Sequence, residues 1–115
     1  MDIEKDFEVT MLYELYRPML TEKQQSVLDM YYNLDYSLAE IAANEGISRQ
    51  AALDTIKKGT EKLYKAEEGL MLYARYQKTA ALLEQLEQEA QKMPEPQRKI
   101  VLAYIGRARL VWEEE

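Results

Sequence analysis

The sequence contains no cysteine and no histidine among its 115 residues. Without cysteine the chain cannot form disulfides or thiolate zinc sites, and it has no cysteine nucleophile. Without histidine it lacks the commonest general base and the commonest transition-metal ligand. The chain also has no phosphate-loop motif. The composition therefore predicts a protein that is not an enzyme and that holds neither a metal ion nor a cofactor.

Glycine and proline are scarce, with four and three residues. So few turn formers argue against a chain of short strands, whereas the abundant Leu, Ala, Glu, Gln and Lys favour helix. No apolar run approaches the roughly 20 residues of a membrane span. Residues 1–4 are acidic where a signal peptide would be basic. We therefore expect an all-α, cytoplasmic protein without a membrane partner.

Basic residues are fewer than acidic ones. The chain has 15 Lys and Arg but 21 Asp and Glu, which gives a formal net charge of -6. This sign argues against a protein that coats nucleic acid non-specifically. The deficit is uneven along the chain. Residues 1–36 carry 3 basic and 8 acidic side chains, residues 37–65 carry 5 and 4, and residues 66–115 carry 7 and 9. Any basic face is therefore expected in the middle segment.

Apolar spacing and capping signals divide the chain into helices. Thr21 with Gln24, and Ser37 with Glu40, match capping boxes at the starts of two of them. The predicted helices cover residues 3–17, 22–32, 38–44, a long stretch from 49 to 93, and 97–112. The long stretch is either one helix or two helices separated near Gly69. We expect a helix-turn-helix domain over residues 1–65, and a helical extension over residues 66–115 that packs on it or on a second subunit.

Residues 37–58 have the pattern of a helix-turn-helix unit. Small Ala42 allows a close approach of two helices, Gly46 suits the sharp turn between them, and Ser48 can cap the second helix. In such a unit the second helix lies in the major groove of DNA, and its early residues, here Arg49, Gln50, Leu53 and Asp54, are those that could meet base edges. The candidate nucleic-acid-binding residues are Ser48, Arg49, Gln50, Leu53, Lys57 and Lys58. The alternative on spacing alone is a tight corner between two helices with ordinary caps.

Within this unit, Arg49 opposes the dipole of its helix, which favours a ligand as the reason for its presence. For Gln50 two interpretations remain open, a contact with a base edge or a solvated side chain in the first turn. Lys62 and Lys65 alternate with glutamates and are expected on a solvated face. Core packing, rather than base stacking, is expected for most of the tyrosines near the motif, which are Tyr31, Tyr32 and Tyr36.

The residues around this unit carry a family resemblance. Residues 20–25 (LTEKQQ), 31–32, 36–42 (YSLAEIA) and 47–51 (ISRQA) resemble region 4 of bacterial sigma factors. With the long helix that follows, roughly residues 5 to 90 resemble the YlxM family, whose members are associated, through gene neighbourhood, with the signal recognition particle and its receptor GTPase. The chain departs from the Val and Tyr common in that family at Ala52 and Leu53.

The resemblance implies a non-enzymatic, nucleic-acid-binding or regulatory accessory of the signal recognition particle pathway. Its partners would be DNA or structured RNA and components of that particle. The rival hypothesis is a protein-interaction module that keeps the sigma-like fold but binds a GTPase or RNA polymerase. The charge around Arg49, Lys57 and Lys58 separates the two, because a nucleic-acid site requires a positive surface there.

A second apolar pattern follows the motif. Residues at steps of three and four form the seam of a helix that packs along another helix. They are Tyr73, Tyr76, Ala80, Leu83, Leu86, Ala90 and Met93. We expect a homodimer through residues 73–93, and the alternative is that the chain folds back on itself.

Overall fold

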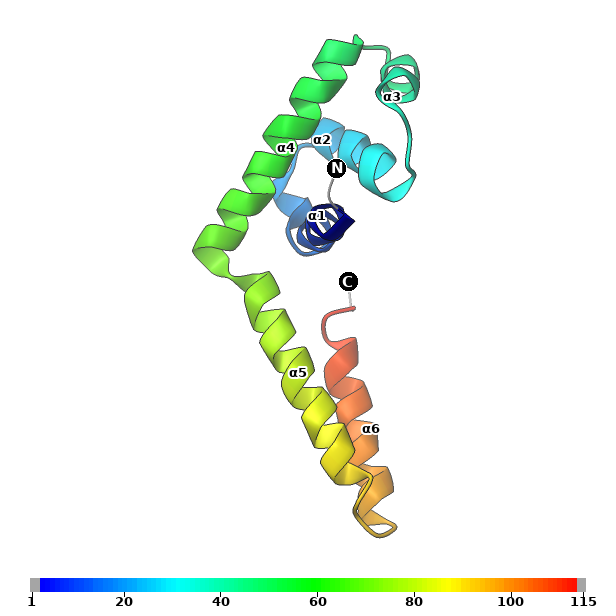
Figure 1. Ribbon diagram of the computed structural model, residues 1–115, viewed down its shortest axis with the longest axis vertical. Coiled ribbons are helices and arrows are strands. Elements are labelled where there is room, and N and C mark those ends of the chain that lie inside the picture. The colour runs from blue at the N-terminus through cyan, green and yellow to red at the C-terminus, as the bar shows by residue number, and fades with distance from the viewer. Residues whose placement is uncertain (1–2, 114–115) are drawn as a thin grey trace. The chain divides into compact units, whose positions relative to one another are not determined.

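The computed structural model describes residues 3–113, with side chains from Phe7 onward, and these residues form a series of helices (Figure 1). The helices are α1 (Ile3–Tyr16), α2 (Glu22–Leu28), α3 (Leu38–Glu45), α4 (Arg49–Leu70), α5 (Leu72–Ala90) and α6 (Gln97–Leu110). The expected all-α fold is confirmed. The chain divides into two compact units, Met1–Tyr73 and Ala74–Glu115, and α4 runs without a break across residues 65 and 66.

The second helix changes type before it ends. Instead of one helix over residues 22–32, α2 is followed by a wider π-helical turn, η2 (Asp29–Asn33). The Asn33 side chain donates a hydrogen bond to Asp29 at 2.8 Å, and the N–H of Leu34 donates to the Asp29 carbonyl at 3.0 Å. These bonds close a turn that is wider than an α-turn, as π-bulges within helices do.

The long stretch from Arg49 is two helices, and the break lies at Met71. Met71 has a φ of 56°, in the left-handed region, where a helix commonly ends. The break comes two residues after Gly69, although Gly69 is the residue with the lower helix propensity. The side chains of Tyr16 and Glu67 accept hydrogen bonds from the first N–H groups of α5, and these bonds stabilise a new helix start after Met71. The last helix ends at Leu110, two residues earlier than expected.

Two hydrophobic clusters fill the first unit, and α4 contributes to both. The first cluster contains Val9, Leu12, Tyr13, Tyr16, Leu20, Leu28, Leu63 and Ala66. The second contains Val27, Met30, Ile41, Ala52 and Ile56. Because α4 spans both clusters, its amino-terminal half is held against α3 while its carboxy-terminal half is held against α1.

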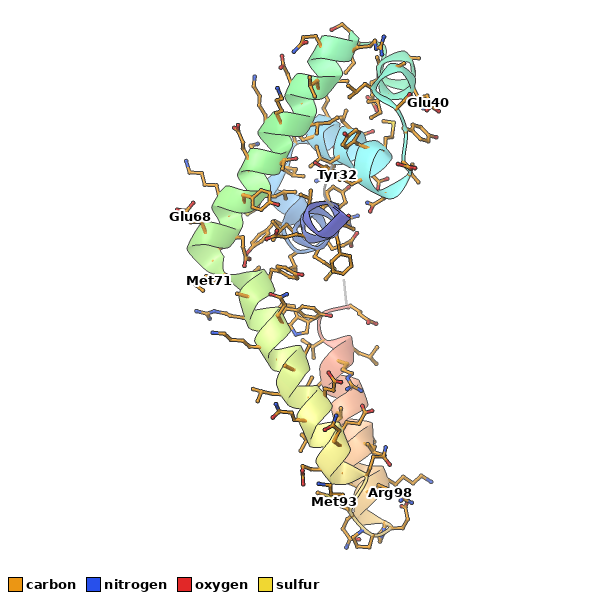
Figure 2. The ribbon with its side chains drawn as sticks, viewed as in Figure 1. Tyr32, Glu40, Glu68, Met71, Met93 and Arg98 are labelled. Carbon is orange, nitrogen blue, oxygen red and sulfur yellow. The ribbon has the colours of Figure 1, made fainter. Side chains whose placement is uncertain are left out.

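Tyr32 packs against both clusters and is directed into the first unit, whereas Glu40 and Glu68 project outward from their helices (Figure 2). The Tyr32 hydroxyl lies 3.4 Å from the Thr60 hydroxyl. Tyr31 and Tyr36 are half-buried against the second cluster. The expectation that these tyrosines pack in the core is thus confirmed for all three.

The second unit is an antiparallel hairpin of α5 and α6, with Met93 and Arg98 near its closed end (Figure 2). The rings of Tyr76 and Trp112 meet edge to face, with centroids 5.5 Å apart, and Glu87 pairs with Arg109. No helix within the described part of the chain is both long enough and apolar enough to cross a membrane.

Candidate nucleic-acid interface

The turn between α3 and α4 has the geometry that the sequence predicts. The Ser37 hydroxyl accepts a hydrogen bond from the N–H of Glu40 and begins α3. Gly46 ends α3 in the left-handed conformation with φ 69°, which glycine adopts without steric penalty. The N–H of Ile47 returns to the Ala42 carbonyl at 3.0 Å. The Ser48 hydroxyl then accepts from the N–H of Ala51 at 3.0 Å, and α4 begins at Arg49.

Buried side chains fix the relation between the two helices. Ile41 of α3 and Ala52 of α4 are fully buried in the second cluster, and Ile47 packs against the same cluster from the turn. The small Ala42 is also buried beside the turn. Because this core holds both helices, the first turns of α4 are a rigid surface rather than a loop, which is the arrangement that recognition requires.

The candidate residues lie at the start of α4 and along its first three turns. Arg49, Leu53 and Lys57 follow one another at four-residue steps, so they lie along one side of the helix. Ser48, Arg49, Gln50, Lys57 and Lys58 are exposed, and Leu53 is half-buried. Lys58, nine residues after Arg49, points toward the opposite side of the helix, so the structure places Arg49, Leu53 and Lys57 together and Lys58 apart from them. Ser48 is the helix cap.

Asp54 lies within this face and changes its chemistry. The Gln50 amide donates a hydrogen bond to the Asp54 carboxylate at 3.3 Å. Gln50 is therefore held by its own helix, and a base that used Gln50 would have to displace Asp54. The sequence analysis did not use this pairing, although Gln and Asp at a four-residue step are a recognisable helix pair.

The basic residues further along α4 have another environment. The Lys62 ammonium donates to the Gln24 side chain at 3.0 Å, and Gln24 also accepts from the N–H of Thr21 in the cap of α2. Lys62 thus ties α4 to the start of α2, a role that the sequence analysis missed. Lys65 is exposed, as expected of a solvated face.

Two glutamates on α3 set the acidic surroundings of this face. The N–H of Ser37 donates to the Glu40 carboxylate at 3.0 Å, and this hydrogen bond lowers the pKa of Glu40 below its usual value. Glu45 accepts a hydrogen bond from the Ser26 hydroxyl at 2.7 Å. Glu40 is therefore engaged with the start of α3, and Glu45 with a side chain of α2. Within residues 37–58, the cations are Arg49, Lys57 and Lys58.

Comparison with known proteins agrees with this geometry. The family described as "Putative helix-turn-helix protein, YlxM / p13 like", UPF0122, matches residues 3–102. The chain belongs to the UPF0122 family. This result confirms the resemblance to the YlxM family, and the match extends past the Pro94–Pro96 segment into α6. The helix-turn-helix assignment is thus supported by both the fold and the family.

Several UPF0122 proteins are close in sequence. One from Limosilactobacillus reuteri (strain DSM 20016) is 48% identical over 77 residues, which cover 67% of this chain and 68% of the relative. One from Lacticaseibacillus casei (strain BL23) is 46% identical over 77 residues, with the same coverage. UPF0122 protein YofM from Lactococcus lactis subsp. lactis (strain IL1403) is 45% identical over 86 residues, which cover 75% of this chain and 78% of the relative.

Proposed function

We propose that this UPF0122 protein binds nucleic acid with the exposed face of α4 and acts as a regulatory accessory. One observation carries the proposal: exposed Arg49 is the first residue of α4, three residues after the left-handed turn at Gly46. A cation there opposes the helix dipole by up to about 1 kcal/mol. A ligand with negative charge offsets this opposition. Lys57, two turns further along, extends the same positive surface.

Each residue has a role in the proposed complex. Arg49 is suited to bidentate contacts with a guanine edge or with phosphate, because its guanidinium presents paired donors. Lys57 and Lys58 are suited to the phosphate backbone, which positions the protein without reading sequence. Leu53 offers an apolar contact between them. Duplex DNA and structured RNA share the phosphate chemistry, and the proposed complex forms in the cytoplasm.

The test is a binding titration against duplex DNA and against a folded RNA, each at about 50 and 200 mM salt. We expect Arg49→Ala to weaken binding and to leave thermal stability nearly unchanged. Lys57→Ala with Lys58→Ala should flatten the log-log salt slope by roughly one for each lost phosphate contact. Lys99→Ala removes an exposed cation from the second unit and serves as the matched control. Wild-type protein without salt-dependent binding to either nucleic acid would overturn the proposal.

A second candidate function is favoured by Asp54. A carboxylate in the middle of the exposed face, with Gln50 bonded to it, suits a basic protein surface better than a phosphate backbone. In that case the sigma-like fold binds a GTPase or RNA polymerase. Salt-dependent binding to the purified protein partner, lost in Asp54→Asn and absent with nucleic acid, would support this function.

The role in the signal recognition particle pathway rests on the family resemblance. Its test is direct binding to the RNA and to the receptor GTPase of that particle. An unrelated folded RNA of similar length is the control. Equal affinity for the two RNAs, with no binding to the GTPase, would separate nucleic-acid binding from that pathway.

A further inference from the structure

The second unit buries very little. Of its described residues 74–113, only Ala90 and Ile105 are buried. A cavity of about 160 Å³ remains between the two helices, lined by Tyr76, Leu83 and Arg109 among others. Two helices on their own seldom bury enough apolar surface for stability, and helical bundles of this kind usually have four. The hairpin therefore resembles one half of a four-helix bundle, with two helices and little buried apolar surface.

Part of the seam predicted for a homodimer faces the inside of this hairpin, whereas Leu86 of the same seam is 44% exposed. Tyr76 contacts Trp112, Leu83 lines the cavity shared with α6, and Ala90 is fully buried. These three residues are therefore packed within the chain, as expected if the chain folds back on itself. Dimerisation stays a prediction, and the surface available for it lies elsewhere on the hairpin.

Large apolar side chains are exposed on the outside of the hairpin. On α5 they are Leu82 and Leu86, with 65% and 44% of their surface exposed, and on α6 they are Ile100, Tyr104 and Val111, with 54%, 63% and 62% exposed. Helical spacing places each set roughly a quarter turn from the line on which the two helices meet. Because the helices are antiparallel, both sets are rotated toward the same side. The five residues form one surface, the outer apolar face.

The opposite side of the hairpin is largely polar. A quarter turn the other way, α5 presents exposed Gln77, Ala81 and Gln88, and α6 presents exposed Lys99 and Gly106. Of the large exposed apolar residues of the hairpin, five lie on the outer apolar face, whereas Leu110, which is 52% exposed, lies one turn after Gly106 on the other side.

We propose that a second copy of this chain covers the outer apolar face, so that two hairpins form a four-helix bundle. Charge complementarity identifies the occupant. Beside the outer apolar face, α6 carries the cation Arg107 and α5 carries the anion Glu89, both exposed; Arg109 and Arg98 are instead paired within the chain, with Glu87 and Glu95. A two-fold axis that lays α6 on α5 of the other copy brings opposite charges together, so the hairpin complements itself.

The edges of the outer apolar face show the same complementarity. Arg107 lies at the α6 edge, with its guanidinium 5.4 Å from the centre of the Tyr104 ring. Glu89 lies at the α5 edge and is exposed. In the two-fold pair, Arg107 of each copy approaches Glu89 of the other. Charge pairs at the rim of an interface fix its register more than its strength.

The exposed area is sufficient for a dimer. With about 200 Å² for each large side chain, the five exposed fractions correspond to roughly 600 Å² per hairpin. Two copies then bury about 1,200 Å², which reaches the lower limit for stable protein interfaces. This proposal does not depend on nucleic-acid binding by α4.

Sedimentation velocity of the full chain tests the proposal, with Leu82→Glu against Ala81→Glu. Both residues are exposed neighbours on α5, but only Leu82 lies on the outer apolar face. We expect wild type and Ala81→Glu to sediment as dimers at about 100 μM. Leu82→Glu should raise the dimer dissociation constant by tenfold or more, because it would bury a charge in an apolar interface. Circular dichroism verifies that both variants keep their helix content.

Charge reversal tests the register. Arg107→Glu should weaken the dimer, and Arg107→Glu combined with Glu89→Arg should restore it. A wild-type chain that remains monomeric at every concentration overturns the proposal and assigns the face to a different protein. A dimer that Leu82→Glu leaves unchanged, or that both glutamate variants weaken equally, also overturns it. Failure of the double reversal to restore the dimer overturns the two-fold pairing of α6 with α5.

Discussion

The hydroxyl of Tyr16 donates a hydrogen bond to the Glu67 carboxylate at 2.6 Å and accepts one from the N–H of Leu72 at 2.9 Å. The same Glu67 oxygen accepts from the N–H of Tyr73 at 2.8 Å. A tyrosine of α1 and a glutamate of α4 therefore satisfy the first two N–H groups of α5, which have no partner within their own helix. The left-handed Met71 between the two helices makes this arrangement possible.

Tyr16→Phe should destabilise the protein by about 1 to 3 kcal/mol, because it removes both hydrogen bonds of a nearly fully buried hydroxyl. Chemical denaturation followed by circular dichroism measures this effect. Tyr104→Phe is the matched control, since Tyr104 is 63% exposed. Equal stability of Tyr16→Phe and Tyr104→Phe would show that the hydroxyl of Tyr16 does not stabilise the start of α5.

Stability should also fall at alkaline pH. Burial raises the pKa of Tyr16 above its usual value of 10.0, with a further contribution from the hydrogen bond to Glu67, and burial likewise raises the pKa of Tyr13 and Tyr64. The unfolded chain therefore releases these protons at lower pH than the folded chain. Their stabilising contribution is complete below about pH 10 and is lost as pH rises through the folded pKa values.

The measurement is the urea midpoint at about pH 9 and at about pH 11. Tyr16→Phe should lose less stability than wild type between these values, because it lacks one of the three shifted groups. Tyr104→Phe again provides the comparison. An equal loss in wild type and Tyr16→Phe would contradict the raised pKa of Tyr16.

The local features of the fold could be predicted from sequence, because each depends on neighbouring residues. The capping box at Ser37, the left-handed turn at Gly46 and the cap at Ser48 all lie where the sequence places them. The end of α4 could not be predicted in the same way. It depends on Tyr16, which is 51 residues from Glu67 in the chain, and helix propensity gives no signal for such a contact.

Two glycines of α4 should respond oppositely to alanine. A Cβ on Gly59 would lie 2.8 Å from Cδ1 of the fully buried Leu28, whereas a Cβ on Gly69 would have no neighbour within 4 Å. Overpacking costs about 1 to 3 kcal/mol, which exceeds the gain in helix propensity of about 1 kcal/mol. We expect Gly59→Ala to destabilise the protein and Gly69→Ala to stabilise it by about 0.5 to 1 kcal/mol in denaturant titrations. Stabilisation by both would show that Leu28 moves aside without loss of packing.

The candidate site was predictable in its position but not in its chemistry. Helical spacing from Ser48 was enough to place Arg49, Leu53 and Lys57 on one face. The outer apolar face of the hairpin was missed, because apolar spacing on α5 fits two stripes and only the structure shows which one α6 covers. The seam with Leu83 is the covered stripe, and the stripe with Leu82 is the exposed one.

The charge of Asp54 gives the sharpest separation between the two candidate functions. Asp54→Asn removes the one anion between Arg49 and Lys58 and leaves a polar side chain of the same size. If the face binds phosphate, the variant should bind duplex DNA or folded RNA more tightly than wild type, by about threefold to tenfold at low salt, because a repulsive charge is gone. If the face binds a basic protein surface, the same variant should bind that partner more weakly.

Asp35→Asn is the matched control, since it removes an exposed carboxylate of the same unit away from α4. Fluorescence anisotropy at about 50 and 200 mM salt measures both variants. The gain in affinity should be specific to Asp54→Asn and should shrink at the higher salt, because ions screen the repulsion that the mutation removes. An equal gain in affinity with Asp35→Asn would show that the effect comes from the net charge of the protein and not from the position of Asp54. Such a result would separate the binding of nucleic acid from the face that begins at Arg49.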